Sequence, residues 1–427
     1  MTVLAKQSVA SISKFQTEQL KETLNYVLEK SPYYKKVFAE AGVSSSDIQS
    51  LEDLRKLPFT TKDDLQQHND AFFCVPKTEI IDYVTTSGTL GSPVAIGLTE
   101  ADLNRLAANE AQALACAGIS KEDTVQLMTT IDRRFMAGLA YFMGLRQIGA
   151  SVIRVGSGVP ELQWDSILKF QPTYIICVPS FLLKLINYAK THGIDMASTS
   201  VTAAICIGEP VRNPDFELNT LGSKITSDWD IDLYTTYAST EMQTAFTECE
   251  HHLGGHLQPE RIIAEILDEQ NEPVANGDEG ELVITTLGVQ ALPLVRFRTG
   301  DIVRAHYDAC NCGRNTLRLG AVMGRKQHMI KYKGTTLYPP AMYDVLGDFD
   351  QILSFVIEVS HNEVGTDEIV LKVVSDDISE AFKEQIKDHF RAKLRVSPKI
   401  VFTTEDRIDE LQFPKMSRKR IQLIDRR

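Results

Sequence analysis

TVQLM at residues 124–128 is the first of four short runs that are rich in β-branched residues. The others are SVIRV at 151–155, YIICV at 174–178 and VTAAICI at 201–207. A stretch with helical spacing separates each run from the next. Strands that alternate with helices are the signature of parallel α/β structure. These runs therefore predict a parallel sheet with flanking helices.

The flanking sequence extends this pattern in both directions. A helix is predicted over Thr99–Ala117, because Thr99 can cap the Ala/Leu-rich stretch that follows it. Residues 12–40 also show helical spacing. Further along, Arg261–Leu267 and Gly280–Thr286 have the pattern of antiparallel strands joined by a turn-rich segment.

The residue pattern of the sequence changes near Met323–Lys326, which indicates a domain boundary. Beyond it, a strand-like run at Ser354–Val359 and a helical stretch at Glu380–Leu394 suggest a small α+β domain of about 100 residues. The predicted fold class is therefore α/β. We expect a large N-terminal domain, 1–325, of parallel or mixed sheets with an antiparallel β subdomain, and a C-terminal α+β domain, 326–427.

The amino-acid composition excludes some classes of function. The chain has 427 residues, more than one hydrophobic core usually serves, and 43% hydrophobic with 24% charged residues indicates a globular protein. The net charge of -12 argues against a nucleic-acid partner. No segment approaches a membrane-spanning length, and the first residues lack the apolar core of a signal peptide. We therefore expect a cytoplasmic enzyme without a membrane partner.

A loop rich in hydroxyls and glycines, Thr85–Pro93, lies between two strand-like runs. Gly88 and Gly91 permit close backbone approach, and the amides and hydroxyls can donate hydrogen bonds to a polyanion. The loop is not that of the P-loop NTPases, because no lysine follows Gly91. Taken alone, it predicts either a phosphate cradle or an ordinary hairpin turn.

A second polar motif, Tyr237–Glu241, follows the strand-like run Ile231–Thr235. A hydroxyl beside a carboxylate at a strand end can bind phosphate and hold Mg²⁺, which favours carboxylate and phosphate oxygens. The alternative is an ordinary helix start, capped by Ser239 or Thr240.

Three further motifs lie downstream. Asp301, which follows a strand and a glycine, can accept the two hydroxyls of a ribose or can be a simple turn aspartate. Gly324-Arg325 and then Lys331–Gly334 stand at the expected domain junction. The basic segment Phe413–Arg420 is by itself typical of a solvated face.

The order and spacing of these motifs resemble the adenylate-forming superfamily of carboxylate ligases, and specifically its phenylacetate–coenzyme A ligase branch. The resemblance covers nearly the whole chain and rests on SPYYKKVF at 31–38, the loop at 85–93, IGEP at 207–210, Tyr237–Glu241, GELVITTL at 280–287, ALPLVRFRTGD at 291–301, Gly324-Arg325, and Lys419 with Asp425–Arg427. It implies an ATP-dependent carboxylic acid–coenzyme A ligase that forms an acyl-adenylate and releases AMP and pyrophosphate. ATP, Mg²⁺ and coenzyme A are the implied cofactors.

The resemblance also implies roles for individual residues. The implied nucleotide contacts are Thr86, Ser87, Gly88, Thr89 and Gly91 on the β- and γ-phosphates, and Gly208, Glu209, Pro210, Tyr237 and Ala238 around the adenine. Thr240 would touch the α-phosphate, and Glu241 would hold Mg²⁺. Asp301 would bind the ribose hydroxyls, assisted by Arg325.

The C-terminal domain would act as a mobile lid. Lys419 would reach from it to the attacking carboxylate and the α-phosphate, so the implied catalytic residues are Lys419, Thr240 and Glu241. After the adenylate forms, rotation near Arg325–His328 would withdraw Lys419 and present Lys333 and Gly334 to the thiol of coenzyme A.

Two other functions stay open, and three departures from the family pattern bear on the second of them. Ser92 stands where many relatives carry lysine, Gln327 at the usual acidic hinge, and Arg418 where glycine is expected. One alternative is an enzyme that adenylates an acid and loads it onto a carrier-protein thiol. The other is a catalytically degenerate nucleotide-binding relative.

Three of the seven cysteines lie outside the apolar runs and form a separate pattern with a histidine. Cys249, His256, Cys310 and Cys312 can complete a tetrahedral, structural Zn²⁺ site in which the C-x-C-G turn acts as a knuckle. Free surface thiols and ordinary polar histidines are the alternative, and His251 or His252 could replace His256 as the ligand. The site would tie the loop after Glu241 to the loop after Asp301.

The sequence says less about which acid is the substrate than about the nucleotide. Asp132–Leu139 aligns by texture with the family's substrate-pocket loop, and Phe135 and Ala238 suit an apolar or aromatic body. Asp132, Arg133 and Arg134 could point to solvent or could meet a more polar acid. Phenylacetate or a related aryl acid is the leading expectation. The sequence leaves the oligomeric state open, and the resemblance allows a homodimer.

Overall fold

The computed structural model describes residues 4–86, 94–332, 335–361, 367–413 and 421–427. The chain divides into two compact units. The first comprises Met1–Leu218, Gly222–Thr299 and Val303–Val322, and the second comprises Asn219–Leu221, Gly300–Ile302 and Met323–Arg427.

The largest sheet within the described residues has 11 strands, in the order β10-β11-β12-β13-β9-β8-β7-β6-β5-β3-β4. Its parallel half consists of β3 (Thr124–Leu127), β4 (Ser151–Arg154), β5 (Tyr174–Cys177), β6 (Ala203–Ile207) and β7 (Asp232–Ser239). The four predicted strand runs are therefore confirmed, and all four pair in parallel. Most side chains of β3, β5 and β6 are buried, as expected of strands covered on both faces, whereas β4, at the end of the sheet, has no buried residue.

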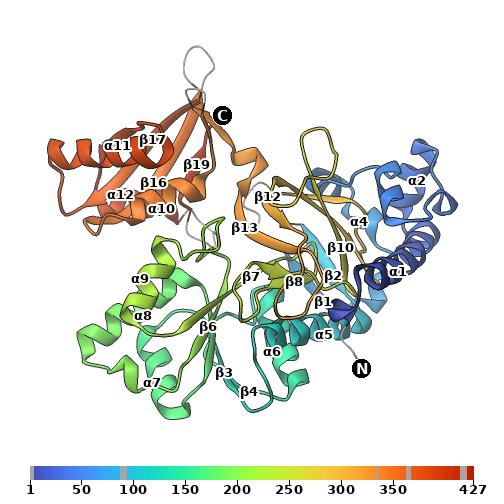
Figure 1. The fold of residues 1–427 in the computed structure, drawn as a ribbon, viewed down its shortest axis with the longest axis horizontal. Helices are drawn as coiled ribbons and strands as arrows, with labels where there is room; N and C mark the ends of the chain where they lie inside the picture. Colours follow the sequence, from blue (N-terminus) through green and yellow to red (C-terminus); the bar gives the residue numbers. More distant parts are fainter. Residues whose placement is uncertain (1–3, 87–93, 333–334, 362–366, 414–420) are drawn as a thin grey trace. The chain divides into compact units, whose positions relative to one another are not determined.

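The other half of this sheet contains the antiparallel strands. It consists of β8 (Thr244–Thr247), β9 (Gly255–His256), β10 (Ile262–Leu267), β11 (Glu279–Thr286), β12 (Phe297–His306) and β13 (Arg318–Arg325). The predicted antiparallel pairing of 261–267 with 280–286 is confirmed by β10 and β11. These strands continue the parallel strands in one mixed sheet through the antiparallel pair β7 and β8 (Figure 1).

The helices predicted over 12–40, over 99–117 and between the parallel strands are present, and the short helices α3 and α4 are additional. The elements are α1 (Val9–Lys30), α2 (Pro32–Ala41), α3 (Lys62–Gln67), α4 (Asn69–Phe72), α5 (Glu100–Cys116), α6 (Met136–Ile148), α7 (Pro160–Phe170), α8 (Pro179–His192) and α9 (Thr220–Asp228). The helical stretch 12–40 is split because Pro32 opens α2 and Ser31 caps it. Thr99 and Asp102 cap α5 reciprocally, which explains why that helix begins where predicted.

The N-terminal helices share a core with the antiparallel half of the sheet. Leu20 and Leu24 of α1 and Phe38 of α2 belong to the same buried cluster as Ile262 and Leu282. A short hairpin of β1 (Asp82–Thr85) and β2 (Ala95–Leu98) adds Val84 and Ile96 to this core. Among the described residues, no helix combines the length and apolar character needed to cross a bilayer.

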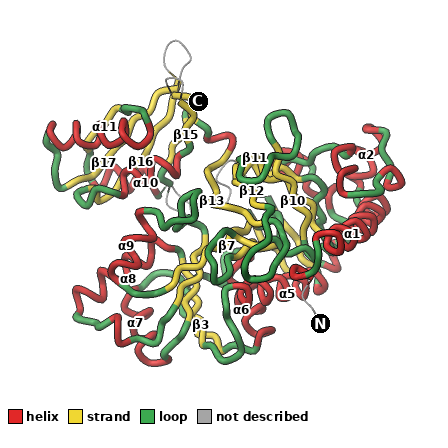
Figure 2. Tube along the Cα trace, viewed as in Figure 1, coloured by secondary structure: helices red, strands yellow, loops and turns green. Residues whose placement is uncertain are grey.

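The second unit has its own sheet and core. Its elements are β14 (Ile330–Tyr332), β15 (Thr335–Leu337), α10 (Pro339–Gly347), β16 (Ile352–His361), β17 (Asp367–Ser375), α11 (Glu380–Leu394), β18 (Lys399–Phe402), α12 (Glu405–Gln412) and β19 (Leu423–Asp425). The sheet runs β18-β17-β16-β19, with α10, α11 and α12 beside it (Figure 1 and Figure 2). Helix α11 has the bounds that the sequence predicts, and the unit is α+β as expected.

Candidate active site and metal centre

The carboxyl ends of β6 and β7 bring two predicted nucleotide segments together. Ile207 and Thr236 are register partners on these neighbouring parallel strands, so Gly208 and Tyr237 are the next residues on each. Gly208 adopts a left-handed conformation, with φ of +75°, where the chain turns away from the sheet. Ligands of open α/β sheets bind outside the carboxyl ends of parallel strands.

Glu209 has a structural contact that the sequence does not reveal. Its carboxylate accepts hydrogen bonds from the Ser180 backbone N–H at 2.9 Å and from the Ser180 hydroxyl at 3.0 Å. Ser180 lies in the first turn of α8, whose own N-cap residue, Val178, has no capping side chain. The carboxylate therefore caps this helix and lies at the positive end of its dipole. This contact fixes the loop that carries Gly208 and Pro210.

The segment Tyr237–Glu241 ends a strand and begins a tight turn. Tyr237, Ala238 and Ser239 pair with the beginning of β8, and the turn contains Thr240 and Glu241. Its last residue, Gln243, has φ of +49° and donates its N–H to the Ser239 carbonyl at 3.3 Å. The alternative of a helix start is therefore wrong. The pairing of β7 with β8 displays Thr240 and Glu241, both partly exposed, at the sheet edge.

The base of the predicted phosphate loop is closed by Thr86. Its backbone N–H donates to the Val94 carbonyl at 3.0 Å, and its buried hydroxyl accepts from the Val94 N–H at 3.0 Å. Residue Thr86 thus holds the two strands of the hairpin together. The other predicted phosphate contacts, Ser87, Gly88, Thr89 and Gly91, lie outside the described residues, as do Lys333, Gly334 and Lys419.

The predicted acid-pocket loop is bonded to this hairpin. The Thr85 N–H donates to the Arg134 carbonyl at 3.1 Å. Arg133 and Arg134 both adopt left-handed conformations, with φ of 59° and 58°, which non-glycine residues keep only when their surroundings hold them. Phe135 is half-buried immediately before α6, and Ala238 is exposed on β7. The structure therefore joins the phosphate hairpin to the loop predicted to receive the acid.

Asp301 and Arg325 form an ion pair in the second unit. The Arg325 Nε lies 3.4 Å from the Asp301 Oδ1, and Asp301 is 8% exposed. Gly324 precedes Arg325 where a Cβ would lie 2.8 Å from the Tyr338 Cβ, so only glycine fits there. The two residues expected to serve the ribose are therefore in contact.

The four predicted zinc ligands converge on one point. The ligand atoms of Cys249, His256, Cys310 and Cys312 all lie within 4.8 Å of one another. The Cys249 Sγ lies 3.7 Å from the Cys310 Sγ and 3.4 Å from the His256 Nε2, and the Cys312 Sγ lies 3.5 Å from that nitrogen. Tetrahedral Zn²⁺, with bonds of about 2.3 Å to sulfur and 2.0 Å to nitrogen, requires S···S near 3.8 Å and S···N near 3.5 Å.

The surroundings of this cluster suit a closed metal centre. His256 Nδ1 lies 3.4 Å from the Thr316 hydroxyl, which orients the ring so that Nε2 faces the thiols. Burial lowers the pKa of His256 to about 3, so its imidazole is neutral. Burial alone would raise the pKa of Cys312, but hydrogen bonds from Arg314 outweigh it and lower that pKa. The cluster joins the segment after β8 to the loop between β12 and β13.

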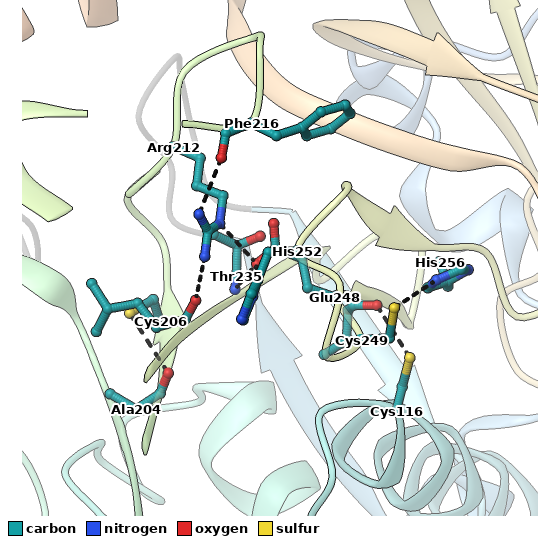
Figure 3. A network of polar contacts seen from close by, with 12 residues as sticks. Cys116, Ala204, Cys206, Arg212, Phe216, Thr235, Glu248, Cys249, His252 and His256 are labelled. Atoms are coloured by element: carbon teal, nitrogen blue, oxygen red, sulfur yellow. Dashed lines mark hydrogen bonds and ion pairs between the residues drawn. The ribbon is translucent and has the colours of Figure 1, made fainter. Parts of the chain in front are cut away.

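A buried ion pair that sequence reasoning missed lies next to the cluster (Figure 3). The Arg212 Nε lies 3.4 Å from the Glu248 Oε2, and that carboxylate accepts the Thr235 N–H at 2.9 Å. Arg212 also donates to the carbonyls of Phe216 at 3.0 Å and Leu233 at 3.1 Å. Only the positions of the two residues in the sequence could have indicated this pair. Arg212 follows Pro210 by two residues, and Glu248 immediately precedes the proposed metal ligand Cys249.

Comparison with known proteins agrees with this geometry. The AMP-binding enzyme family matches residues 11–290. The phenylacetate-coenzyme A ligase of Thermus thermophilus is 33% identical over 380 residues, which are 87% of this chain and 82% of that enzyme. This chain belongs to the AMP-binding enzyme family. The phenylacetate-coenzyme A ligase of Escherichia coli is 31% identical over 352 residues, 81% of this AMP-binding enzyme and 78% of the relative.

The fold of this AMP-binding enzyme is shared with a ligase of known structure. A crystal structure of 2-hydroxyisobutyryl-CoA ligase, in the postadenylation state with R3-HIB-AMP, superposes with a TM-score of 0.85. The match covers 99% of this chain and 91% of that one, at 22% sequence identity. At this identity the likeness establishes the fold, and it confirms the predicted α/β class.

Proposed function

We propose that this AMP-binding enzyme is an ATP-dependent carboxylic acid–coenzyme A ligase that acts on phenylacetate or a related aryl acid. The observation that carries the proposal is the register of β6 and β7, which aligns Gly208–Pro210 with Tyr237–Glu241 at one sheet edge. The relatives named phenylacetate-coenzyme A ligase support the same reaction. ATP, Mg²⁺, coenzyme A and a small acid are the substrates and cofactors consistent with this family.

The proposed reaction has two steps. A carboxylate oxygen attacks the α-phosphorus of ATP, the bond from that phosphorus to the bridging oxygen breaks, and pyrophosphate leaves. The thiol sulfur of coenzyme A then attacks the acyl carbon, the bond to the AMP oxygen breaks, and the thiol proton goes to solvent. Because the first step brings two anions together, positioning and charge neutralisation supply most of the catalysis.

The proposed residue roles follow this charge balance. Thr240 contacts the α-phosphate, and Glu241 holds Mg²⁺, whose charge offsets that of the phosphates. Asp301 accepts the ribose hydroxyls, and its contact with Arg325 supports that assignment. Lys419 is the residue proposed to neutralise the attacking carboxylate, and Lys333 and Gly334 are proposed to serve the coenzyme A step; all three lie outside the described residues. The cytoplasmic location, the homodimer and the roles of the two domains stay predictions.

Pyrophosphate release tests the function. We expect release with aryl-acetic acids in a panel of aryl and alkyl acids, and AMP formation that consumes coenzyme A in equal amount. Release without consumption of coenzyme A would favour a carrier-protein thiol as the acceptor. No release with any acid would favour the degenerate relative and would contradict the ligase proposal.

We propose further that the Cys/His cluster binds structural Zn²⁺. The measured separations fit tetrahedral coordination, and four protein ligands leave no open position for catalysis. The metal would cross-link the segment that follows β8 to the loop that precedes β13. His251 and His252 do not belong to the group of converging ligand atoms, which favours His256.

Replacing Cys310 with serine tests the zinc proposal. We expect bound zinc to fall from about one ion per chain to about none, and the melting temperature to fall by several degrees, because metal binding contributes to folding stability. Elemental analysis and calorimetry measure the two quantities. Cys74→Ser, at a buried thiol outside the cluster, is the matched control and should keep its zinc. Full zinc content in Cys310→Ser would overturn the proposal.

A further inference from the structure

Arg105 of α5 is a buried cation whose four hydrogen bonds, among the described residues, go to carbonyl and hydroxyl oxygens and none to a carboxylate. Its guanidinium donates to the carbonyls of Leu287 at 2.7 Å, Gln243 at 2.8 Å and Arg261 at 2.6 Å, and to the Thr244 hydroxyl at 3.2 Å. Arg105 is 5% exposed. Burial lowers its pKa to about 9, so the side chain stays charged at neutral pH.

Two of these four acceptors belong to the end of the turn that carries Thr240 and Glu241. Gln243 has a left-handed backbone conformation, and its carbonyl accepts a hydrogen bond from the Arg105 Nη1. The side-chain amide of Gln243 is buried, and within the described residues neither its nitrogen nor its oxygen has a hydrogen-bond partner. The side chain of Gln243 therefore adds no bond to this turn, which is held by the N–H groups of Met242 and Gln243 on Ser239 and by the guanidinium of Arg105.

The other two acceptors connect the turn to separate strands. The Leu287 carbonyl follows β11, and the Arg261 carbonyl precedes β10. A planar guanidinium with five donors can bond acceptors from several directions at once. A lysine ammonium, with three donors on one nitrogen, cannot reach this set. The position therefore requires the shape of arginine in addition to its charge.

We propose that Arg105 is a positioning residue that holds the turn 240–243, so that Thr240 and Glu241 meet the α-phosphate and Mg²⁺. This inference rests on the proposed ligase function. It assigns to α5 a part in adenylation that lies outside the motifs of the family resemblance. Arg105 acts through the backbone of Gln243 and the hydroxyl of Thr244, and does not itself touch the substrate.

Arg105→Lys tests this proposal, because lysine keeps the positive charge but lacks the planar guanidinium with its five donors. We expect kcat of acid-dependent pyrophosphate release to fall by about 10- to 100-fold, as small misplacements of catalytic groups do. The Mg²⁺ concentration for half-maximal rate should rise, and KM for the acid should change little. Titration calorimetry should show that Mg²⁺ increases ATP affinity less in the variant than in the wild type.

A stability control separates positioning from general damage. Leu182→Ala creates a cavity in α8, which contributes none of the four acceptors of Arg105, and should lower the melting temperature while leaving the Mg²⁺ dependence unchanged. Equal Mg²⁺ dependence of ATP affinity in wild type and Arg105→Lys would overturn the inference. A wild type that binds ATP but releases no pyrophosphate would contradict the ligase function alone, since the binding measurement does not need turnover.

Discussion

Lys419→Ala should lower acid-dependent pyrophosphate release by about 100-fold or more, while thioester formation from a supplied acyl-adenylate is retained. In the first step two anions meet, and Lys419 is the side chain proposed to neutralise the attacking carboxylate. In the second step the nucleophile is a thiol and the phosphate is already esterified. The charge of Lys419 then matters much less, and the two half-reactions should respond differently.

The measurement uses both half-reactions on one protein preparation. Pyrophosphate release reports adenylation, and coenzyme A consumption with synthetic acyl-adenylate reports thioester formation. Lys415→Ala removes the same charge from the same basic segment and is the matched control, which should keep both activities. Equal loss of both half-reactions in Lys419→Ala would refute the proposed division of labour between the two steps.

Much of the fold could be predicted from local pattern. Strands β3 to β6 lie where short runs with β-branched residues predict them, and β3, β5 and β6 are largely apolar because they are buried. Helix α11 was predicted with both bounds, since its amphipathic repeat is long and Ser379 caps it. The break between α1 and α2 also has a local cause, Pro32.

The turn after β7 shows where local pattern fails. Ser239 and Thr240 fit a helix cap as well as a strand end, so the sequence left both readings open. The pairing of β7 with β8 decides between them, and that pairing depends on tertiary contacts. The convergence of Cys249 and Cys310, 61 residues apart, was predicted from ligand chemistry, but their separation could come only from the fold.

The residues that support the site were harder to predict than the residues proposed to form it. Arg105 stands in an Ala/Leu-rich helix, where an arginine ordinarily faces solvent. Its acceptors Gln243, Arg261 and Leu287 are 138 to 182 residues away in sequence. Local spacing carries no information on such contacts. Motif residues could be predicted because the family resemblance preserves their order.

Breaking the ion pair of Arg212 and Glu248 should strongly destabilise the chain near the candidate site. The side chains are 13% and 1% exposed, so removing one partner leaves a charge buried. We expect Arg212→Met to lower the free energy of unfolding by about 3–5 kcal/mol, because the Glu248 carboxylate would lose its cation. Glu248→Gln keeps an acceptor for the Thr235 N–H and should cost less.

A double-mutant cycle measures this coupling. In Arg212→Met/Glu248→Gln no buried charge is stranded, so the loss of stability should be smaller than the sum of the single losses by about 1–3 kcal/mol. Denaturant unfolding measures the free energies, and zinc content shows whether the adjacent Cys249 still binds metal. Because Arg212 anchors the loop after Pro210 and Glu248 holds β7 before Tyr237, KM for ATP should rise in Arg212→Met while KM for coenzyme A is unchanged. Additive losses, or an unchanged KM for ATP, would mean that the pair only fills the interior and does not connect the metal centre to the nucleotide loop.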